Sequence, residues 1–383
     1  MIDHAAIDAL VAWMIDGAPP IPRAPLIIDR ICRELLEAGV IYDRLALFLP
    51  TLSPRSSGRR YKWTPSGGVE IGDSEVGLFN TLDYLANPVP EVLRDQVTIR
   101  RRLIDPDTPD DYRILAELRA EGYTDYLIQP PPFATGGSAA MSWSTHVAGG
   151  FSDEMLGALE RIRGPVARLV ESLVMRTNAT TLLSAYIGRN SGEQVLSGKV
   201  HRGDGEEIQA AILFTDLIGY TELSNGRSGR EIVALLNDTF DRFVPAVEAK
   251  GGEILKFLGD GFFAIFPYED DDALPDAVRR AQAAVLAGER ALAGTKVGET
   301  ARFRSAIHAG QFHYGNIGGA DRLDFTAIGR SVNYASRLMT ASSELSIARA
   351  ASMDVAGHLS PPVSLAGEAR LKGFDGLHKV YTF

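Results

Sequence analysis

The chain has 383 residues, of which 45% are hydrophobic and 23% charged, and its formal net charge is −10. This length suits two domains of ordinary size rather than one. The composition excludes overall disorder, and the acidic balance argues against a nucleic-acid-binding surface, because such surfaces are usually basic. The single cysteine, Cys32, has no partner for an intrachain disulfide or a zinc site, and its apolar neighbours predict a small buried side chain.

No segment predicts export or membrane insertion. The first residues, MIDHAAIDAL, lack the positive region and apolar stretch of a secretory signal peptide. No apolar run approaches the roughly 20 residues that a helix needs to cross a bilayer. We therefore expect a cytoplasmic protein without a membrane span, whose signals reach it inside the cell.

The first part of the chain predicts a small domain of helices and strands. Residues 26–38 have the apolar spacing of a helix, and the apolar run 45–49 predicts a buried strand. Further strands are expected around residues 61–63, 126–129 and 139–147. A helix, a set of strands and a closing helix in this order resemble the GAF and PAS sensor domains. The resemblance implies a small-molecule ligand of the N-terminal domain, which the sequence does not name.

A long helix is predicted to close this domain, with Ser152 as its N-cap. Its apolar residues follow a 4-3-4 spacing, and they are Ile162, Val166, Leu169 and Leu173. This spacing suits either the seam of a coiled coil between two chains or an amphipathic helix that lies on its own domain. Gly164-Pro165 predicts a kink or a break in the helix. The polar, glycine-containing stretch 188–207 is expected to form a hinge or linker.

The second half of the chain alternates between strands and helices. The pattern predicts strand 208–214, helix 232–247, hairpin strands 254–257 and 262–266, helix 273–291 and strand 303–309. Strand, helix, hairpin, helix and strand in this order give a ferredoxin-like split arrangement. The fold class is therefore α+β, with a ferredoxin-like C-terminal domain preceded by an α/β domain and a helical linker. The expected divisions are a sensor domain 1–160, a helical signalling linker 161–204 and a C-terminal domain 205–383.

Two aspartates indicate the chemistry of the C-terminal domain. Asp216 ends its first strand, and Asp260 lies in the tight hairpin between the next two strands. If the hairpin pairs beside the first strand, both carboxylates meet at one end of the sheet. Either aspartate alone would be interpreted as a turn or cap residue, but the pair suits two divalent metal ions that neutralise a triphosphate. The turn Ile218-Gly219-Tyr220-Thr221 follows, and its backbone N–H groups are expected to contact phosphate.

Five stretches of this half carry a pattern shared with a known family. They are AILFTDLIGYTELS, GGEILKFLGDGFFAIF, FRSAIHAGQFHYGNIG, LDFTAIGRSVNYASRL and LKGFDGLHKVYTF. Over residues 205–383 and in family order, they resemble the catalytic domain of class III adenylyl and guanylyl cyclases. Several separate motifs in register are more specific than a lone short pattern. The resemblance implies a nucleotidyl cyclase, which is a phosphorus–oxygen lyase.

The resemblance also implies which residues hold metal and base. Asp216 and Asp260 match the two metal ligands, and the Leu217 carbonyl is an added ligand. Lys256 matches the lysine that reads the adenine ring, and Thr326 occupies the second base-reading position. This Lys–Thr pair is similar to that of bicarbonate-responsive soluble adenylyl cyclases, which adds bicarbonate as a candidate effector. Guanylyl cyclases usually place Glu where Lys256 stands, so the pair favours ATP over GTP.

Four further side chains complete the implied site. Asn333 and Arg337 match the pair that orients the ribose and stabilises the pentavalent phosphorus. They are four residues apart, so on a helix they project from one face, and a guanidinium suits charge that spreads over phosphoryl oxygens. Arg304 matches a phosphate-contacting arginine, and Lys372 matches a lysine from a loop.

Together these residues predict an adenylate cyclase that converts ATP to 3′,5′-cyclic AMP and pyrophosphate, with two Mg²⁺ or Mn²⁺ ions in each active site. In this family two catalytic domains pair head to tail. The resemblance therefore implies a homodimer in which one chain supplies the metal aspartates, Lys256 and Thr326, and its partner supplies Asn333 and Arg337. The N-terminal domain would regulate how the two halves meet.

Three alternatives follow from the same residues. Base preference rests on two positions, so guanylate cyclase activity stays open, as does a catalytically silent nucleotide-binding signalling protein. The stretch Gly251-Gly252-Glu253 resembles part of the diguanylate cyclase signature. Ile254 stands where that signature needs its second acid, which disfavours this third alternative.

Overall fold

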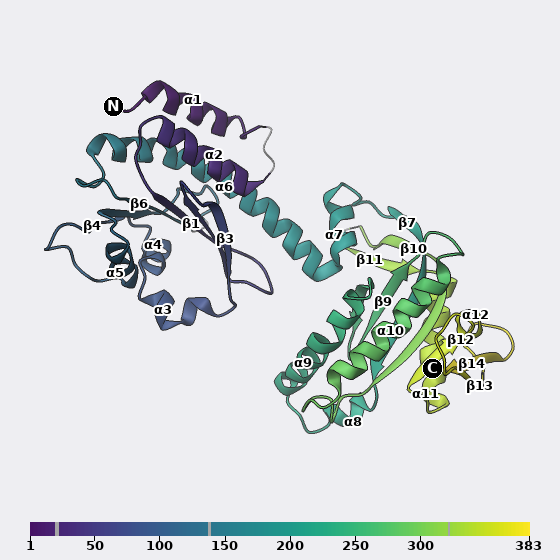
Figure 1. The fold of residues 1–383 in the computed structure, drawn as a ribbon. Helices are drawn as coiled ribbons and strands as arrows, with labels where there is room; N and C mark the ends of the chain where they lie inside the picture. Colours follow the sequence, from purple (N-terminus) through teal and green to yellow (C-terminus); the bar gives the residue numbers. More distant parts are fainter. Residues whose placement is uncertain (20–22, 137–138, 321) are drawn as a thin grey trace. The chain divides into compact units, whose positions relative to one another are not determined.

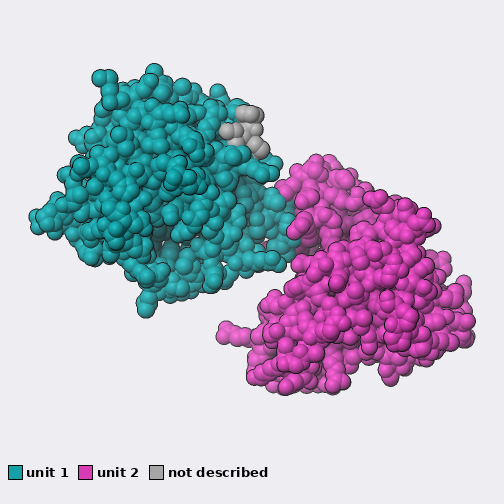
Figure 2. All heavy atoms as spheres, viewed as in Figure 1, with its two compact units in different colours: residues 1–185 teal, residues 186–383 magenta. Residues whose placement is uncertain are grey.

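The computed structural model describes residues 1–19, 23–136, 139–320 and 322–383. The chain divides into two compact units, residues 1–185 and 186–383, which Figure 2 colours separately. The boundary between the units lies near the end of one long helix, α6 (Asp153–Ile187). The two halves of the expected linker 161–204 thus belong to different units. Among the described residues, none of the helices has the length and apolar character needed to span a bilayer.

The first unit is built on a six-stranded antiparallel sheet in the order β3-β2-β1-β6-β5-β4 (Figure 1). The four strands expected from the sequence are present, and β3 and β4 extend the sheet at its two edges. The strands are β1 (Arg44–Pro50), β2 (Gly58–Thr64), β3 (Gly68–Ser74), β4 (Ile99–Arg102), β5 (Asp125–Gln129) and β6 (Ala140–Thr145).

Helices cover both faces of this sheet (Figure 1). One face packs against α1, α2 and α6, and the other against the short helices between β3 and β5. Buried apolar side chains therefore project from both sides of the strands. The remaining helices of this unit are α1 (His4–Ile15), α2 (Ala24–Glu37), η1 (Leu78–Asn80), α3 (Leu82–Leu85), α4 (Val89–Asp95) and α5 (Arg113–Ala120).

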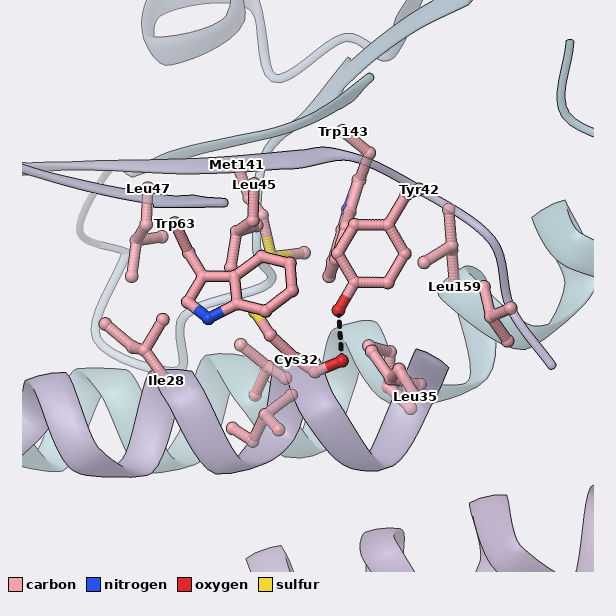
Figure 3. Close-up of a cluster of buried hydrophobic side chains, with 14 of the residues drawn as sticks. Ile28, Cys32, Leu35, Tyr42, Leu45, Leu47, Trp63, Met141, Trp143 and Leu159 are labelled. Atoms are coloured by element: carbon pink, nitrogen blue, oxygen red, sulfur yellow. Dashed lines mark hydrogen bonds between the residues drawn. The ribbon is translucent and has the colours of Figure 1, made fainter. Parts of the chain in front are cut away.

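Aromatic side chains form the core between the sheet and α2 (Figure 3). The Tyr42 and Trp143 rings pack edge to face with their centroids 4.9 Å apart, and the Trp63 ring centroid lies 5.6 Å from that of Tyr42. The Tyr42 hydroxyl donates to the Cys32 carbonyl at 2.7 Å. Burial raises the pKa of the Cys32 thiol, whose residue has 0% exposure. The prediction of a small buried side chain at Cys32 is confirmed.

Helix α6 runs without a break through Pro165, so the prediction of a break there is wrong. The side chains of Ile162, Val166 and Leu169 are buried in the core of their own unit. This packing on both sides of Pro165 outweighs the hydrogen bond that proline removes. Of the two interpretations of the 4-3-4 spacing, the structure shows the amphipathic helix on its own domain. Ser152 caps the helix as expected, with its Oγ accepting from the Met155 N–H at 3.2 Å.

The second unit contains the expected ferredoxin-like core of β7, α9, β8, β9, α10 and β10. These strands lie side by side in the order β10-β7-β9-β8, and β12, β14 and β13 continue the sheet beyond β10 (Figure 1). The strands are β7 (Gly205–Leu217), β8 (Glu253–Leu258), β9 (Gly261–Pro267), β10 (Phe303–Gly318), β11 (Leu323–Ile328), β12 (Arg349–Ser352), β13 (Ser364–Ala369) and β14 (His378–Thr382). The helices are α7 (Arg189–Leu196), α8 (Tyr220–Ser224), α9 (Gly229–Glu248), α10 (Leu274–Leu292), α11 (Arg330–Glu344) and α12 (Met353–Ala356).

The two faces of this second sheet differ in how they are covered. Helices α9 and α10 bury one face over a core that includes Phe243, Phe262 and Phe303. The other face carries α11 and the strand β11, which is paired with the C-terminal part of β10. Phe214 packs on this second face, and Asp216 lies two residues beyond it on β7, so the candidate site lies on this face.

The stretch 188–207, expected to form a hinge or linker, contains helix α7. The Asn190 side chain donates to Glu253 of β8 at 2.5 Å, and the hydroxyls of Ser191 and Tyr314 share a hydrogen bond. Val195 packs against the core on the β11 side of the sheet. The polar residues that suggested a solvated linker are used to attach α7 to the sheet.

Candidate active site

The hairpin between β8 and β9 brings Asp260 next to Asp216. Strand β9 pairs antiparallel with β7, and Phe262 lies opposite Thr215. A Cβ atom on Gly261 would lie 1.9 Å from the Thr215 carbonyl oxygen, so only glycine allows the hairpin to approach β7 this closely. The Gly-Asp-Gly turn of the sequence is therefore a geometric requirement for placing the two carboxylates together.

Burial and the charge of Asp260 contribute to a raised pKa of the Asp216 carboxyl. Burial, followed by the charge of Asp260 and a hydrogen bond with it, raises the pKa of Asp216 to about 6. The guanidinium of Arg304, directly across from Asp216 on β10, opposes this rise. Two like charges held in contact favour a bound cation, because the cation removes the repulsion.

The donor set fits a hard divalent cation that also binds substrate. Among the described residues, no cluster of three or more His, Cys, Asp or Glu side chains could hold a metal ion. Asp216 and Asp260 supply two carboxylates, and the main chain at Leu217 lies directly beyond Asp216. The other ligands of an ion here would be water and phosphate oxygens, which is the usual way in which Mg²⁺ is held.

The turn after β7 is only partly available to phosphate. The Ile218 N–H donates to the Arg302 carbonyl at 2.8 Å, so the expectation that this group is free is wrong. Gly219 adopts a left-handed conformation with φ of 74°, and helix α8 starts at Tyr220. Tyr220 also packs against the core under α9 and α10.

Lys256 lies on the same face of the sheet as Asp216. It is opposite Phe263 on β9, and Phe263 is in turn opposite Phe214 on β7, two residues before Asp216. Directly paired residues share a face, and so do residues two apart on a strand. The stacked rings of Phe214 and Phe263, with centroids 4.8 Å apart, form the apolar floor between them.

The Lys256 ammonium contacts a residue that the sequence analysis missed. Its Nζ lies 2.5 Å from Oδ2 of Asp324, on β11. Thr326, the second expected base-reading residue, stands two positions beyond Asp324 and therefore on the same face of β11. The signal for Asp324 was this period of two around the buried Phe325, but the 68-residue separation from Lys256 gave no indication of contact.

Asn333 and Arg337 are both exposed on the outer side of α11. The helix buries Ala335 and Leu338 against the sheet, so the two functional candidates point away from their own sheet. The structure therefore brings Asp216, Asp260 and Arg304 together within one chain and does not bring Asn333 and Arg337 to them.

Lys372 lies exposed in the turn between β13 and β14. Phe374 of the same turn packs edge to face on Tyr334 of α11, with ring centroids 5.0 Å apart. Tyr334 also stacks on His308 of β10, at 4.3 Å between ring centroids. The turn that carries Lys372 is thus held against the helix that carries Asn333 and Arg337.

Comparison with known proteins agrees with this geometry. The model of the family described as the adenylate and guanylate cyclase catalytic domain matches residues 205–383. Adenylate cyclase 1 of Rhizobium meliloti (strain 1021) is 38% identical over 138 residues, which cover 34% of this chain and 20% of that protein. An uncharacterized protein of Mycobacterium tuberculosis is 33% identical over 190 residues, which cover 49% of this chain and 32% of that protein. The chain spans about a fifth to a third of the length of these curated relatives.

Solved structures of cyclases are also similar to the second unit. The adenylyl cyclase CyaB from P. aeruginosa is 26% identical with a TM-score of 0.40, over 46% of this chain and 94% of that chain. The guanylyl cyclase Cya2 is 24% identical with a TM-score of 0.38, over 46% of this chain and 92% of that chain. The family match assigns residues 205–383 of this chain, and not the chain as a whole, to the adenylate and guanylate cyclase catalytic domain.

Proposed function

We propose that the protein converts ATP to 3′,5′-cyclic AMP and pyrophosphate as a homodimer. The observation that carries this proposal is that the β8–β9 hairpin places Asp260 close to Asp216, on the sheet face that also bears Lys256. A pair of like charges in contact is unfavourable unless a cation is bound there during function. ATP is favoured over GTP because a lysine ammonium can donate to the ring nitrogens of adenine, while the Thr326 hydroxyl can accept from its amino group.

Each residue has a defined task in this reaction. Asp216 and Asp260 would hold divalent ions, which would supply charge to lower the pKa of the attacking 3′-hydroxyl and to neutralise the triphosphate. Arg304 lies beside Asp216 and can contact a phosphate oxygen there. The Arg337 guanidinium stabilises charge on the phosphoryl oxygens, and Asn333 orients the ribose. Positioning and charge stabilisation thus supply most of the acceleration, as is general for transfer at phosphorus.

The exposure of Asn333 and Arg337 supports a site shared between two chains. Both side chains point away from the sheet that carries Asp216 and Asp260. A symmetric pair of chains repeats every contact twice, so a homodimer would form two equivalent sites, each with aspartates from one chain and Asn333 and Arg337 from the other. A monomer would form no complete site.

The test is turnover by the full-length protein with ATP or GTP, each with Mg²⁺ or Mn²⁺, scored for cyclic product. We expect cyclic AMP from ATP, and no product from Asp260→Ala. Cyclic GMP as the main product would establish the guanylate cyclase alternative. Absence of product under all four conditions, with retained nucleotide binding, would establish the silent signalling protein instead.

We further propose that the first unit is a regulatory sensor domain of the GAF or PAS kind, acting through α6. A cavity of about 50 Å³ lies between its sheet and helices α2 and α6, with Val166, Val170 and Leu173 of α6 in its wall. The cavity is larger than the roughly 10–15 Å³ that one water needs, and its lining is mainly apolar. It therefore suits a small apolar ligand or the apolar part of a larger one.

Filling the cavity tests this regulatory role. Val170→Phe should change the rate of cyclic AMP formation without changing KM for ATP, because the substitution acts on α6 and not on the site. Met175→Phe is the matched control, since Met175 lies on α6 with 57% exposure and does not line the cavity. Equal rates for both variants and the unmodified protein would exclude regulation through this cavity.

Bicarbonate is a separate candidate effector, based on the Lys256–Thr326 pair. A rise in rate with added bicarbonate at constant pH would support it. An unchanged rate would remove bicarbonate from the list of effectors.

A further inference from the structure

Lys256 is the one base-reading candidate whose side chain is held by another charge. Its ammonium lies 2.5 Å from the Asp324 carboxylate, although β8 and β11 are not neighbours in the sheet. The two side chains are 43% and 57% exposed, so the contact lies at the open rim of the face and not in the core. An exposed ion pair of this kind contributes little to stability. The position of this ion pair indicates that it serves to hold the Lys256 ammonium in one place.

The packing of β11 explains how Asp324 reaches Lys256. Phe325 is buried in the same cluster as Leu255 of β8, and its ring meets Tyr314 edge to face at 4.7 Å. This anchor fixes β11 over the face of the sheet on which Lys256 lies. Because neighbours on a strand point to opposite sides, Asp324 and Thr326 share the side of β11 away from Phe325. The structure thus places one carboxylate and one hydroxyl at fixed spacing, with the ammonium attached to the carboxylate.

A lysine on an edge strand does not hold such a position by itself. Its four-carbon chain has many rotamers, and a free ammonium spends most of its time in water. Asp324 takes one of the three ammonium donors and leaves two for another acceptor. Holding a binding group in its bound position before the ligand arrives lowers the entropic cost of binding.

We propose that Asp324 is a positioning residue that holds the Lys256 ammonium beside Thr326 for the purine ring of the nucleotide. This inference rests on the proposed function, which assigns Lys256 to the base. The carboxylate also masks part of the lysine charge, so the remaining donors act as directed hydrogen bonds more than as a general attraction for phosphate. Asp324 therefore contributes to affinity for the base and to the preference for adenine, and not to the chemical step.

Steady-state kinetics of Asp324→Asn test the proposal. We expect KM for ATP to rise about tenfold while kcat stays within about twofold, because an interaction made equally in ground state and transition state has been lost. The ratio of kcat/KM for ATP to that for GTP should fall, and Asp324→Glu should recover part of the loss. Asp271→Asn removes the same charge from an exposed loop and should leave both constants unchanged. An unchanged KM in Asp324→Asn would overturn the proposal.

A double-mutant cycle separates positioning from an independent contact with the base. If Asp324 acts through Lys256, the double variant Lys256→Ala, Asp324→Asn should bind nucleotide within about twofold of Lys256→Ala alone. Multiplying effects of the two substitutions would show that Asp324 contacts the base itself, which contradicts a positioning role.

Binding of 3′-deoxy-ATP with Mg²⁺ to the full-length chain distinguishes this inference from the proposed reaction, because that analogue lacks the attacking hydroxyl. Weaker binding to Asp324→Asn, in a protein that makes no cyclic product, would sustain the inference and reject the cyclase activity. Equal binding to the unmodified protein and to Asp324→Asn, with normal cyclic AMP formation, would reject the inference and sustain the cyclase activity.

Discussion

Each of the two sheets carries an aspartate at least partly shielded from water, and the surroundings of the two differ. Asp125 of β5 has 0% exposure and accepts from Arg100 Nη2 at 2.6 Å and from the Phe151 N–H at 3.0 Å. Asp216 of β7 lies instead against the like-charged Asp260, which contributes to raising its pKa to about 6. In the first unit, hydrogen-bond donors surround the buried Asp125 carboxylate. In the second unit, Asp216 and Asp260 lie close together and repel each other.

Glu171 repeats the pattern of the first unit. It accepts from the Thr135 hydroxyl at 2.5 Å and from the N–H groups of Thr135 and Ala134 at 2.8 and 2.9 Å. These hydrogen bonds, with that of the Thr135 side chain largest, lower the pKa of Glu171 to about 2. Buried acids that serve stability are satisfied by their own chain, while unsatisfied ones mark a place for a ligand. The comparison predicts opposite results for the same substitution in the two units.

The largest effect is expected at Asp216 and Asp260, the two acids that repel each other. Asp216→Asn should reduce kcat by at least about 10³-fold, because one carboxylate of the proposed metal site is lost. It should not lower the melting temperature in the absence of divalent ions, because the substitution removes a repulsion. In the unmodified protein, Mg²⁺ at 100 times its Kd should add about 2.7 kcal/mol to the free energy of unfolding, and this gain should vanish in the variant.

Activity assays and thermal unfolding with EDTA or Mg²⁺ measure both parts of this prediction. Asp241→Asn, on the exposed side of α9, is the matched control and should retain both activity and the response to Mg²⁺. Full activity in Asp216→Asn would show that the repelling pair is not a metal site.

The next effect concerns the division of the site between two chains. Asp216→Ala and Arg337→Ala should each be inactive alone. After equal amounts are unfolded together and refolded, half of the dimers should be mixed, and one of the two sites in each mixed dimer should be intact. Activity should therefore return to about a quarter of that of the unmodified protein. Absence of any recovery, with mixed dimers shown by mass spectrometry, would place both residues in one chain's site.

Substitution of Asp125, the acid with hydrogen-bond partners, should lower stability, whereas substitution of Asp216 should not. Asp125→Asn leaves the Arg100 charge without its partner inside the first unit, and should lower the free energy of unfolding by about 3 kcal/mol. Urea unfolding followed by tryptophan fluorescence reports on this unit, because Trp13, Trp63 and Trp143 all lie in it. Asp111→Asn, which breaks a more exposed pair with Arg101, should cost less than about 1 kcal/mol. A smaller loss for Asp125→Asn than for Asp111→Asn would refute the comparison.

Much of the second unit could be predicted from sequence because its periodicities are clean. The apolar spacing in α9 and the short apolar runs in β8 and β9 place these elements within a few residues of their observed bounds. Strand β10 continues to Gly318, beyond the expected end at residue 309, because its second part alternates polar and apolar residues and pairs with both β7 and β11. The approach of Asp216 to Asp260 follows from the same register.

Contacts between distant and weakly patterned segments could not be predicted. Helix α7 is polar in sequence because its side chains bond to Glu253 and Tyr314, which lie far along the chain. The short helices α3 and α4 have too few residues for a recognisable period. Val92 of α4 is buried in the core on one face of the first sheet, and α3 contacts the sheet through Tyr84, whose ring centroid lies 6.3 Å from that of Phe48. Asp324 was missed for the same reason: only the folding of β11 over the sheet creates its contact with Lys256.

The smallest expected effect concerns His308, a buried histidine of the second unit. It tests whether buried polar side chains outside the candidate site find hydrogen-bond partners within that unit. His308 stacks on Tyr334, its Nδ1 lies 2.8 Å from Ser352 Oγ, and the Asp354 carboxylate is 3.6 Å away. Burial lowers the pKa of His308 to about 4, and the Asp354 charge opposes this only in part.

Below the unfolded-state pKa of about 6.5, the unfolded chain binds a proton that the folded chain does not, so stability falls as pH falls towards 4. Between pH 7 and pH 5 the loss from this group should be about 2 kcal/mol. The change in the free energy of unfolding between these pH values, measured by urea unfolding, should shrink by that amount in His308→Gln, which keeps a partner for Ser352. An identical pH dependence in the two proteins would mean that His308 is already charged in the folded state.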